Sequence, residues 1–353
     1  MKSDRKTIGI LGGGQLARML AVAAARLGYK TNIYDPDREC PASDVSSQNK
    51  IASFSDQSSL IDFAKNIDVL TFEFENIPVS SLNIISEIVP VFPSTNSLAL
   101  SQNRIHEKAF LGSIGLQTVR YFPIKSMFDY DEALKNINLP AILKTTTEGY
   151  DGKGQVRVTS NTPRNSIAKL LQQNHYILEE VCHFTKEISV IAARSLSGEV
   201  VCFDPGENIH VDGILKRTTV PAVVPKSILD NAVIMAGQIV NALDYVGVMG
   251  IEFFLTSSNQ LIINEIAPRV HNSGHWTQNG CSIDQFEQHI RAITGHNLGN
   301  GDRYVNVKMV NLLGDEVKNA FNYSNGAVHI YGKKLVRPGR KMGHINYISQ
   351  KSN

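Results

Sequence analysis

The sequence has few cysteines and no long apolar run. Its 353 residues include only four cysteines, Cys40, Cys182, Cys202 and Cys281, which form no CxxC pair. Such wide spacing offers neither a disulfide framework nor a zinc site, and it fits a reducing cytoplasm. No stretch approaches about 18 consecutive apolar residues, and the apolar run near the N-terminus is too short for a signal peptide. We therefore expect a cytoplasmic protein without a membrane segment.

The sequence also lacks an excess of charge of either sign. The formal net charge is +2, from 35 Lys and Arg and 33 Asp and Glu residues. This balance gives no reason to expect nucleic acid or an anionic membrane as a partner, so any anion site must be local. A hydrophobic fraction of 42% and a charged fraction of 19% exclude a disordered chain. The length predicts about two or three domains.

The first hundred residues alternate strand-like and helix-like segments. Apolar runs predict strands over Thr7–Leu11, Lys30–Tyr34 and Val69–Phe72. Helical periodicity predicts helices over Gln15–Leu27 and Ser80–Ile88. This alternation indicates an α/β unit with a parallel, doubly wound sheet.

From about residue 104 the pattern changes to short strands with fewer helices, which is typical of an α+β arrangement. Helices are expected over His106–Ile114 and Lys226–Leu243. The expected strands are Ala141–Lys144, Gly154–Val158, Tyr176–Glu180, Ile188–Ala193, Val200–Phe203, Gly250–Leu255 and Gln260–Glu265. Glycine and proline punctuate short apolar runs towards the C-terminus, which predicts a small β-rich end.

A glycine turn follows the first predicted strand. Gly12-Gly13-Gly14 fits the G-x-G-x-x-A pattern, and Asp35 lies 21 residues past Gly14, where a ribose-binding acid of a dinucleotide site would be found. A helix N-terminus with exposed N–H groups can also bind another anionic or polar ligand. The plain alternative is a tight turn that serves only packing, and the residues alone leave all three open.

A cation and a glycine-rich segment come next. Lys144 closes an apolar strand and so projects a fixed positive charge. The segment Gly149–Gln155 contains three glycines, and its backbone N–H groups could fold over phosphates as a lid. It is not a Walker A loop, because no GK[ST] follows. An ordinary surface hairpin is the alternative.

Two carboxylates, Glu252 and Glu265, lie in apolar strands joined by the polar turn Thr256–Asn259, which predicts a hairpin. A charge among apolar neighbours is costly unless it is paired or binds a metal, and opposed carboxylates repel one another without a cation between them. Because Mg²⁺ prefers oxygen ligands, the pair predicts a magnesium site, with Asn264 as a further oxygen donor. The alternative is two solvent-facing carboxylates paired with lysines.

Two polar segments complete the motifs. Arg269, His271 and Asn272 directly follow the acidic strand. An arginine fork can hold a carboxylate or bicarbonate, and histidine and asparagine can complete an oxyanion site. The segment Lys333–Lys341 holds five cations, which suits a phosphate monoester, although a solvated basic segment is the alternative.

Together these segments resemble the ATP-grasp superfamily, and within it the 5-(carboxyamino)imidazole ribonucleotide synthases of purine biosynthesis. The resemblance covers nearly the whole chain and rests on GILGGGQLARM, TFEFENIP, KTTTEGYDGKGQ, INEIAPRVHNSGHWT and RPGRKMGH in this order. It departs at Ala17, where the family more usually has glycine. It implies a Rossmann-like N-terminal domain (1–104), a small central lid domain (105–182) and a C-terminal ATP-grasp domain (183–353). The last of these would carry a small β-rich cap (about 305–353).

The resemblance implies a ligase that couples ATP cleavage to carboxylation. ATP would phosphorylate bicarbonate to carboxyphosphate, and the amine of 5-aminoimidazole ribonucleotide would then take up the carboxyl group, leaving ADP and phosphate. Mg²⁺ is the implied cofactor and a homodimer the implied assembly, with no nucleic-acid or membrane partner.

The resemblance also implies a role for each matching residue. ATP-binding positions would be Arg104, Lys144, Gly149, Tyr150, Asp151, Gly152, Lys153, Gly154, Gln155, Glu179, Glu180, Val181, Cys182, Glu187, His210, Asn264 and Glu265. Glu252 and Glu265 would bind the metal. The ribonucleotide would contact Gln15, Leu16, Glu73, Tyr150, Asp151, Lys333 and Arg340. Arg269, His271 and Asn272 would take the bicarbonate and, with Lys144, form the catalytic set.

Three competing interpretations remain. Another ATP-grasp ligase, such as a formate-dependent glycinamide ribonucleotide transformylase or a biotin carboxylase, would share the ATP site. An NAD-dependent oxidoreductase built on the glycine turn would leave Glu252 and Glu265 without a role. A catalytically silent nucleotide-binding regulator is disfavoured by the apparently intact set of ligands.

Overall fold

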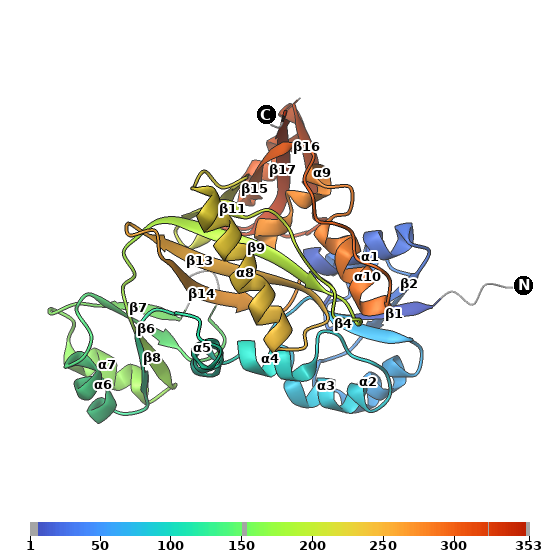
Figure 1. The fold of residues 1–353 in the computed structure, drawn as a ribbon. Coiled ribbons are helices and arrows are strands. Elements are labelled where there is room, and N and C mark those ends of the chain that lie inside the picture. The colour runs from blue at the N-terminus through green and yellow to red at the C-terminus, as the bar shows by residue number, and fades with distance from the viewer. Residues whose placement is uncertain (1–5, 150–153, 324, 351–353) are drawn as a thin grey trace, which may run out of the picture.

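The computed structural model describes residues 6–149, 154–323 and 325–350, which fold around three β-sheets (Figure 1). Four predicted lid residues, Tyr150, Asp151, Gly152 and Lys153, lie outside the described residues. Within the described ranges, no helix is long and apolar enough to cross a membrane.

The N-terminal sheet consists of four parallel strands in the order β3-β2-β1-β4, which confirms the predicted parallel sheet. Its strands are β1 (Thr7–Leu11), β2 (Lys30–Asp35), β3 (Gln48–Ile51) and β4 (Val69–Phe72). The helical segments here are α1 (Gln15–Arg26), η1 (Pro41–Asp44), α2 (Gln57–Ala64), α3 (Val79–Ser86) and α4 (Thr95–Ser101). Strand β3 was not predicted, because this largely exposed edge strand is polar and has no apolar run.

The central unit is built on a small antiparallel sheet in the order β5-β8-β6-β7. Helix α5 (Arg104–Ser113) precedes it. The strands are β5 (Tyr121–Ile124), β6 (Ala141–Thr145), β7 (Gln155–Val158) and β8 (Tyr176–Glu180), with helices α6 (Met127–Leu134) and α7 (Arg164–Leu171). Ile124, Leu143 and Leu178 belong to a core that this unit does not share with the other sheets. In Figure 1 the unit projects from the rest of the molecule.

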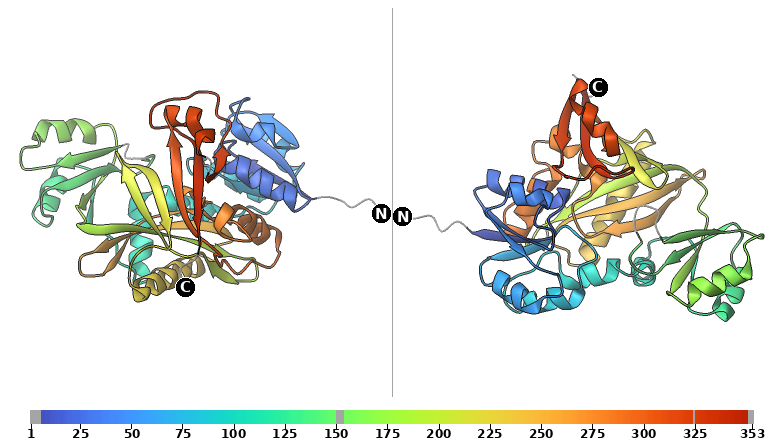
Figure 2. Two further views of the ribbon diagram at one scale, coloured as in Figure 1. Left: turned by 90° about the horizontal axis from the view of Figure 1, so that it is seen from above. Right: turned by 180° about the vertical axis from the view of Figure 1, so that it is seen from behind.

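The third sheet has nine strands, in the order β14-β13-β9-β11-β12-β15-β17-β16, with β10 paired to β9. The strands are β9 (Phe184–Arg194), β10 (Val200–Cys202), β11 (Gly206–Val211), β12 (Ile214–Val220), β13 (Gly247–Thr256), β14 (Leu261–Ala267), β15 (Asn306–Leu313), β16 (Gly326–Ile330) and β17 (Lys341–Ser349). The helices are α8 (Lys226–Ala242), η2 (Asn272–Gly274), α9 (Thr277–Gly280), α10 (Gln285–Thr294) and η3 (Gly314–Asn322). The predicted β-rich end, β15 to β17, continues this large sheet (Figure 2).

The large sheet has two different faces near β13. Ile251, Phe253 and Leu255 pack in a buried core that also contains residues of α8. Successive side chains of a strand point to opposite faces, so Glu252 lies on the face away from α8. On β9, Ile188 belongs to the same core, which places Glu187 on the face of Glu252.

A second core joins the N-terminal sheet to the large sheet. It contains Ile10 and Leu20 from β1 and α1 together with Phe286, Ile290 and Met309 from α10 and β15. Helices α1 and α10 pack against each other. The N-terminal unit and the large sheet therefore form one packed body, to which the central unit is attached.

Candidate active site

Glu252 and Glu265 are direct partners across the antiparallel hairpin of β13 and β14, which confirms the predicted hairpin. Directly opposed residues of this kind have Cβ atoms about 4.5–5.5 Å apart. The register shifts beside the pair, and the pairing skips Asn264. A bulge of this kind changes the direction of the neighbouring side chains. The two carboxylates and the amide of Asn264 thus arise from one short stretch of hairpin.

The surroundings of the carboxylate pair only partly neutralise it. Burial and the charge of Glu265 raise the pKa of Glu252 to about 7, and the opposing charges of His210 and Lys341 do not cancel this rise. Glu265 lies on the other strand, and its Oε2 is 3.7 Å from Nη1 of Arg104. Two adjacent carboxylates whose charge is only partly neutralised fit a divalent cation, because Mg²⁺ takes one or two protein carboxylates and completes its shell with phosphates and water.

The protein supplies only part of such a shell. Among the described residues no group of three or more His, Cys, Asp or Glu side chains could hold a metal ion. A cation at Glu252 and Glu265 would therefore need oxygen atoms from a bound molecule, which is how Mg²⁺ binds with nucleotide phosphates.

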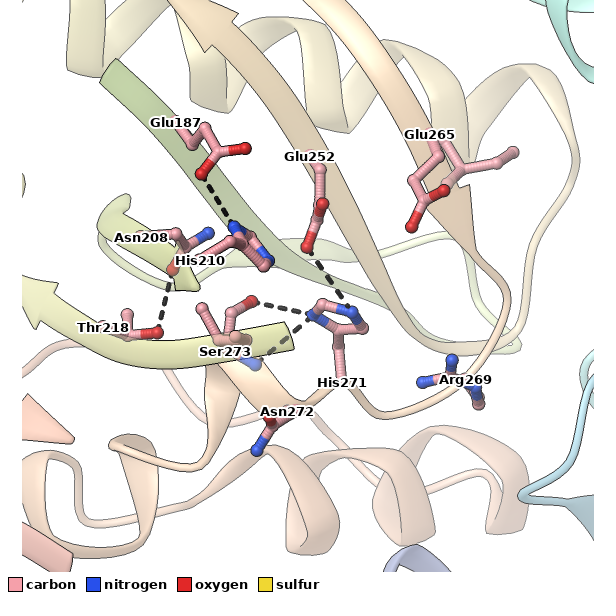
Figure 3. Close-up of polar contacts among 12 residues, drawn as sticks. Glu187, Asn208, His210, Thr218, Glu252, Glu265, Arg269, His271, Asn272 and Ser273 are labelled. Carbon is pink, nitrogen blue, oxygen red and sulfur yellow. Dashed lines mark hydrogen bonds and ion pairs between the residues drawn. The ribbon is translucent and has the colours of Figure 1, made fainter. Parts of the chain in front are cut away.

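A histidine–glutamate pair flanks Glu252 on the same face of the sheet. Nδ1 of His210 lies 2.7 Å from Oε2 of Glu187. Burial lowers the pKa of His210, but the hydrogen bond to Glu187 and the charge of Glu252 outweigh it, and the pKa is raised. Figure 3 shows Glu187, Glu252 and Glu265 side by side on neighbouring strands. His210 lies on β11, a strand that the sequence pattern did not predict.

Lys144 projects from β6 into a buried charge cluster. Its Nζ lies 2.6 Å from Oε2 of Glu179, and Nζ of Lys108 lies 3.2 Å from Oε1 of the same carboxylate. Burial raises the pKa of Glu179, but the two ammonium groups outweigh it, so the pKa is lowered. Lys108 was missed at the sequence level, since a lysine one turn beyond Arg104 in a helix carries no distinguishing pattern.

Other predicted nucleotide residues lie around this cluster. Arg104, at the start of α5, donates to the carbonyl oxygen of Gly149 at 2.9 Å. Gly154 has a positive φ of 72°, which favours glycine, and Gln155 begins β7. The remaining residues, Glu180, Val181 and Cys182, lie at the end of β8 and in the connection to β9.

His271 directs one nitrogen of its ring towards the carboxylate pair. Nε2 lies 3.7 Å from Oε1 of Glu252 (Figure 3). Burial and the charge of Arg269 hold the pKa of His271 well below its ordinary value, so the ring is neutral. Nδ1 lies 2.8 Å from Oγ of Ser273 and 3.4 Å from the backbone nitrogen of the same residue. A serine hydroxyl can donate or accept, so Ser273 orients the ring, with Nε2 facing Glu252, in either neutral tautomer.

The neighbours of His271 are held by residues from distant elements. Nε of Arg269 lies 2.9 Å from Oε1 of Glu75, which follows β4 in the N-terminal unit. Asn272 and Asn311 of β15 exchange amide hydrogen bonds of 3.0 and 2.7 Å. The structure therefore brings the three predicted bicarbonate residues together. It also supplies Glu75, which lies in the motif TFEFENIP but was assigned no role there, and Asn311, for which the sequence offered no signal.

The glycine turn binds carboxylates of the chain itself. The backbone N–H of Gly13 donates to Oδ2 of Asp35 at 2.7 Å, and that of Gly14 donates to Oε1 of Glu73 at 2.9 Å. A Cβ atom on Gly13 would lie 2.2 Å from Sγ of Cys40, so close packing requires glycine there. A dinucleotide pyrophosphate would meet two carboxylates at this turn, which disfavours the NAD alternative.

The basic segment between β16 and β17 lies against the N-terminal unit. Lys334 pairs with Glu39 of that unit. The charge of Lys333 acts to lower the pKa of Glu73, while burial of Glu73 raises it. Arg340 donates through Nη1 to the carbonyl oxygen of Leu335 at 2.8 Å. Lys333 thus lies near the glycine turn and near Gln15 and Leu16, which begin α1 directly after it.

Models of known protein families match most of the chain. Three family models match: a ribonucleotide synthetase preATP-grasp domain at residues 5–102, an ATP-grasp domain at 109–286, and a phosphoribosylaminoimidazole carboxylase C-terminal domain at 308–353. The N5-carboxyaminoimidazole ribonucleotide synthase of Brucella melitensis is 45% identical over 98% of this chain and 97% of that protein.

Two solved structures have the same fold. N5-carboxyaminoimidazole synthetase from Staphylococcus aureus in complex with ADP superimposes with a TM-score of 0.94 at 36% identity, over 98% of this chain and 94% of the other. The Aspergillus clavatus N5-carboxyaminoimidazole synthase in complex with ADP and 5-aminoimidazole ribonucleotide gives a TM-score of 0.91 at 29% identity, over 98% and 94%.

The three sheets and the paired carboxylates on the hairpin define an ATP-grasp enzyme, and the matching ATP-grasp model agrees. Within this class the relatives are specific. The chain belongs to the N5-carboxyaminoimidazole ribonucleotide synthase family, the ligases of purine synthesis that carboxylate 5-aminoimidazole ribonucleotide at the expense of ATP. The predicted fold, family and enzyme class are confirmed.

Proposed function

We propose that this chain carboxylates 5-aminoimidazole ribonucleotide with bicarbonate, through carboxyphosphate, at a site centred on Glu252 and Glu265. The observation that carries the proposal is the pairing of these carboxylates on one sheet face, with Glu187 on one side and the segment Arg269–Asn272 on the other. The Aspergillus relative binds ADP and the ribonucleotide together on the same fold, which supports both substrates for this chain.

The proposed reaction has two steps. An oxygen of bicarbonate attacks the γ-phosphorus of ATP, the bond to the ADP oxygen breaks, and carboxyphosphate forms. The amine nitrogen of the ribonucleotide then attacks the carboxyl carbon, phosphate leaves, and the nitrogen loses a proton. Closure of a lid over such an intermediate would protect it from water.

In this scheme Lys144 and Arg104 bind the ATP phosphates, and Glu187 and His210 lie where the nucleotide sugar would bind. The cluster of Lys144 with Glu179 fixes the ammonium in a dry environment, where its charge acts strongly on a phosphoryl group. Glu252 and Glu265 would hold Mg²⁺, with Asn264 beside them. The ion, when bound, withdraws charge from the phosphate oxygens. The backbone of Gly149–Gln155 would cover the phosphates, and Glu179–Cys182 would receive the adenine edge.

Bicarbonate is assigned to Arg269, His271 and Asn272. The guanidinium would bind the anion, and Nε2 of the neutral His271 ring would form a hydrogen bond with an oxygen of bicarbonate. The ribonucleotide is assigned to Gln15, Leu16, Glu73, Tyr150, Asp151, Lys333 and Arg340, of which Tyr150 and Asp151 lie outside the described residues.

Further parts of the proposal do not depend on the geometry of the site. The domain limits (1–104, 105–182 and 183–353, with a cap at about 305–353) and the homodimer follow from the family resemblance, and the cytoplasmic location follows from the cysteine spacing and the short apolar runs of the sequence. Sedimentation at several concentrations tests the dimer, and a species of monomer mass throughout would rule it out.

Phosphate release from ATP tests the proposed reaction. Full turnover is expected only with Mg²⁺, bicarbonate and 5-aminoimidazole ribonucleotide together. Arg269→Ala should raise the KM for bicarbonate by about tenfold or more and change the KM for ATP little. Phosphate release that ignored both co-substrates would overturn the proposal, and an unchanged rate at limiting bicarbonate would overturn the role of Arg269.

A further inference from the structure

We propose that Glu75 is a positioning residue, which holds Arg269 in the orientation that receives bicarbonate. The inference rests on the proposed role of Arg269. It adds a residue from the N-terminal unit to a pocket that is otherwise built from the large sheet and the segment after it.

The contact between the two side chains is short and sheltered. Oε1 of Glu75 lies 2.9 Å from Nε of Arg269, and the side chains are only 33% and 20% exposed. Nη1 of the same guanidinium donates to the carbonyl oxygen of Val270 at 3.1 Å. Arginine carries five N–H donors in a flat fork, so one held at Nε and Nη1 retains donors for an anion.

The backbone of Glu75 is itself fixed. Nε2 of Gln102 donates to the carbonyl oxygens of Glu75 and Ile77, at 2.7 Å in both cases. Gln102 lies at the C-terminal end of α4, two residues before Arg104. The carboxylate of Glu75 is therefore presented by an anchored turn, and it can define where the guanidinium lies.

Glu73 and Glu75 belong to one short segment, which contacts the glycine turn through one carboxylate and Arg269 through the other. Glu73 accepts from the N–H of Gly14 in the glycine turn, and Glu75 lies against Arg269. Burial raises the pKa of both carboxyls, and the charge of Arg269 acts in the opposite direction on both. The segment thus connects the proposed ribonucleotide side of the site to the proposed bicarbonate side through this one guanidinium.

The physical benefit is preorganisation. A free arginine side chain has many rotamers, and the entropy lost on ordering it would weaken the binding of a small anion. An arginine that is already oriented avoids this loss. Without the Glu75 carboxylate, the guanidinium is free to turn towards Glu73, which already responds to its charge and would compete with bicarbonate.

The test compares Glu75→Gln with Glu75→Asp in the full-length protein. The Gln variant keeps the size but loses the charge, and the Asp variant keeps the charge on a shorter arm. Asp62→Asn is the matched control, since Asp62 makes an exposed ion pair with Lys50 at 3.0 Å elsewhere in the N-terminal unit. For each variant, the KM values for bicarbonate, ATP and 5-aminoimidazole ribonucleotide, kcat and the melting temperature are measured.

We expect the KM for bicarbonate to rise about tenfold in Glu75→Gln and less in Glu75→Asp, with the KM for ATP within about twofold of the wild type. In an Arg269→Ala background, Glu75→Gln should add nothing to the KM for bicarbonate. A merely structural role would instead lower the melting temperature or kcat and leave that KM unchanged, and this would overturn the inference. If Arg269→Ala alters the KM for bicarbonate and Glu75→Gln does not, only the inference about Glu75 fails. If Arg269→Ala has no effect, the proposed role of Arg269 fails as well.

Discussion

Two pairs of half-buried carboxylates near the candidate site differ in their surroundings. Asp35 ends β2 and Glu73 follows β4, on either side of β1, and each accepts a hydrogen bond from a backbone N–H of the glycine turn. Glu252 and Glu265 face each other across β13 and β14, and their backbone groups serve the strand ladder. One pair is stabilised by main-chain dipoles, whereas the other relies on weak side-chain contacts of 3.7 Å.

This difference indicates what each pair can bind. Carboxylates that already accept main-chain hydrogen bonds shape a pocket and can contact a polar ligand without a metal. Carboxylates that face each other without such donors repel, and a cation relieves the repulsion. The number of acidic residues alone would not separate the two sites.

Glu265→Ala should have the largest effect on this comparison. Removal of one of the two proposed metal ligands should lower ATP-dependent phosphate release by about a thousandfold, because the charge of the phosphoryl group is then poorly compensated. The side chain is 43% exposed, so the protein should stay folded. Phosphate release and circular dichroism are the measurements. Near-normal ATP cleavage by the folded variant would contradict the metal assignment.

Glu73→Gln should have an intermediate effect, limited to the ribonucleotide. The amide oxygen can still accept from Gly14, so the turn is kept, but the charge is lost. The KM for 5-aminoimidazole ribonucleotide should rise about tenfold, while the KM for ATP stays unchanged. Asp35→Asn is the matched control at the same turn and should change this KM much less. A loss of ATP binding in Glu73→Gln would show that the two acid pairs do not have separate roles.

Glu252→Gln should have the smallest of the three effects, which is a change in the free energy of unfolding measured without Mg²⁺. Glu252 has a pKa of about 7 in the folded protein and 4.5 as its ordinary value. A raised pKa contributes stability that is fully present below about pH 4.5 and is lost as the pH rises through about 7. At pH 8 the charged side chain is therefore a cost, and Glu252→Gln should raise the free energy of unfolding by roughly 1 kcal/mol.

Urea unfolding at pH 5 and pH 8, without and with Mg²⁺ and ATP, measures this effect. The advantage of the variant should shrink at pH 5, and Mg²⁺ with ATP should stabilise the wild type more than the variant. A variant that is less stable than the wild type at pH 8 without metal would contradict the view that the pair is electrostatically strained.

The sequence predicted those parts of the fold that have a local signal. Strands β1, β4, β13 and β14 are apolar runs with clear ends. The polar turn Thr256–Asn259 predicted the hairpin in which Glu252 and Glu265 lie opposite each other. The polar edge strand β3 and the pair β11 and β12 have no such runs. His210 was reached only through the family resemblance, because its own strand has no pattern to mark it.

The missed residues of the candidate site act through long-range contacts. Lys108 of α5 contacts Glu179 of β8, and Glu75, which follows β4, contacts Arg269, which follows β14. Asn311 on β15 holds Asn272 by paired amides. No spacing rule connects such partners, since their proximity results from the packing of whole units. The motifs marked the residues proposed to touch substrates, and the structure added those that hold them in place.

The core that joins α1 to α10 has a consequence for how the protein is made. Ile10 and Leu20 emerge early from a ribosome, whereas Phe286, Ile290 and Met309, which belong to the same core, emerge near the end. At about 5–20 residues per second, the apolar side of α1 waits on the order of tens of seconds for its partners. A chain that stops before α10 never acquires them. Nascent or prematurely terminated chains therefore expose an apolar helix face, which makes them natural clients for chaperones and prone to aggregation.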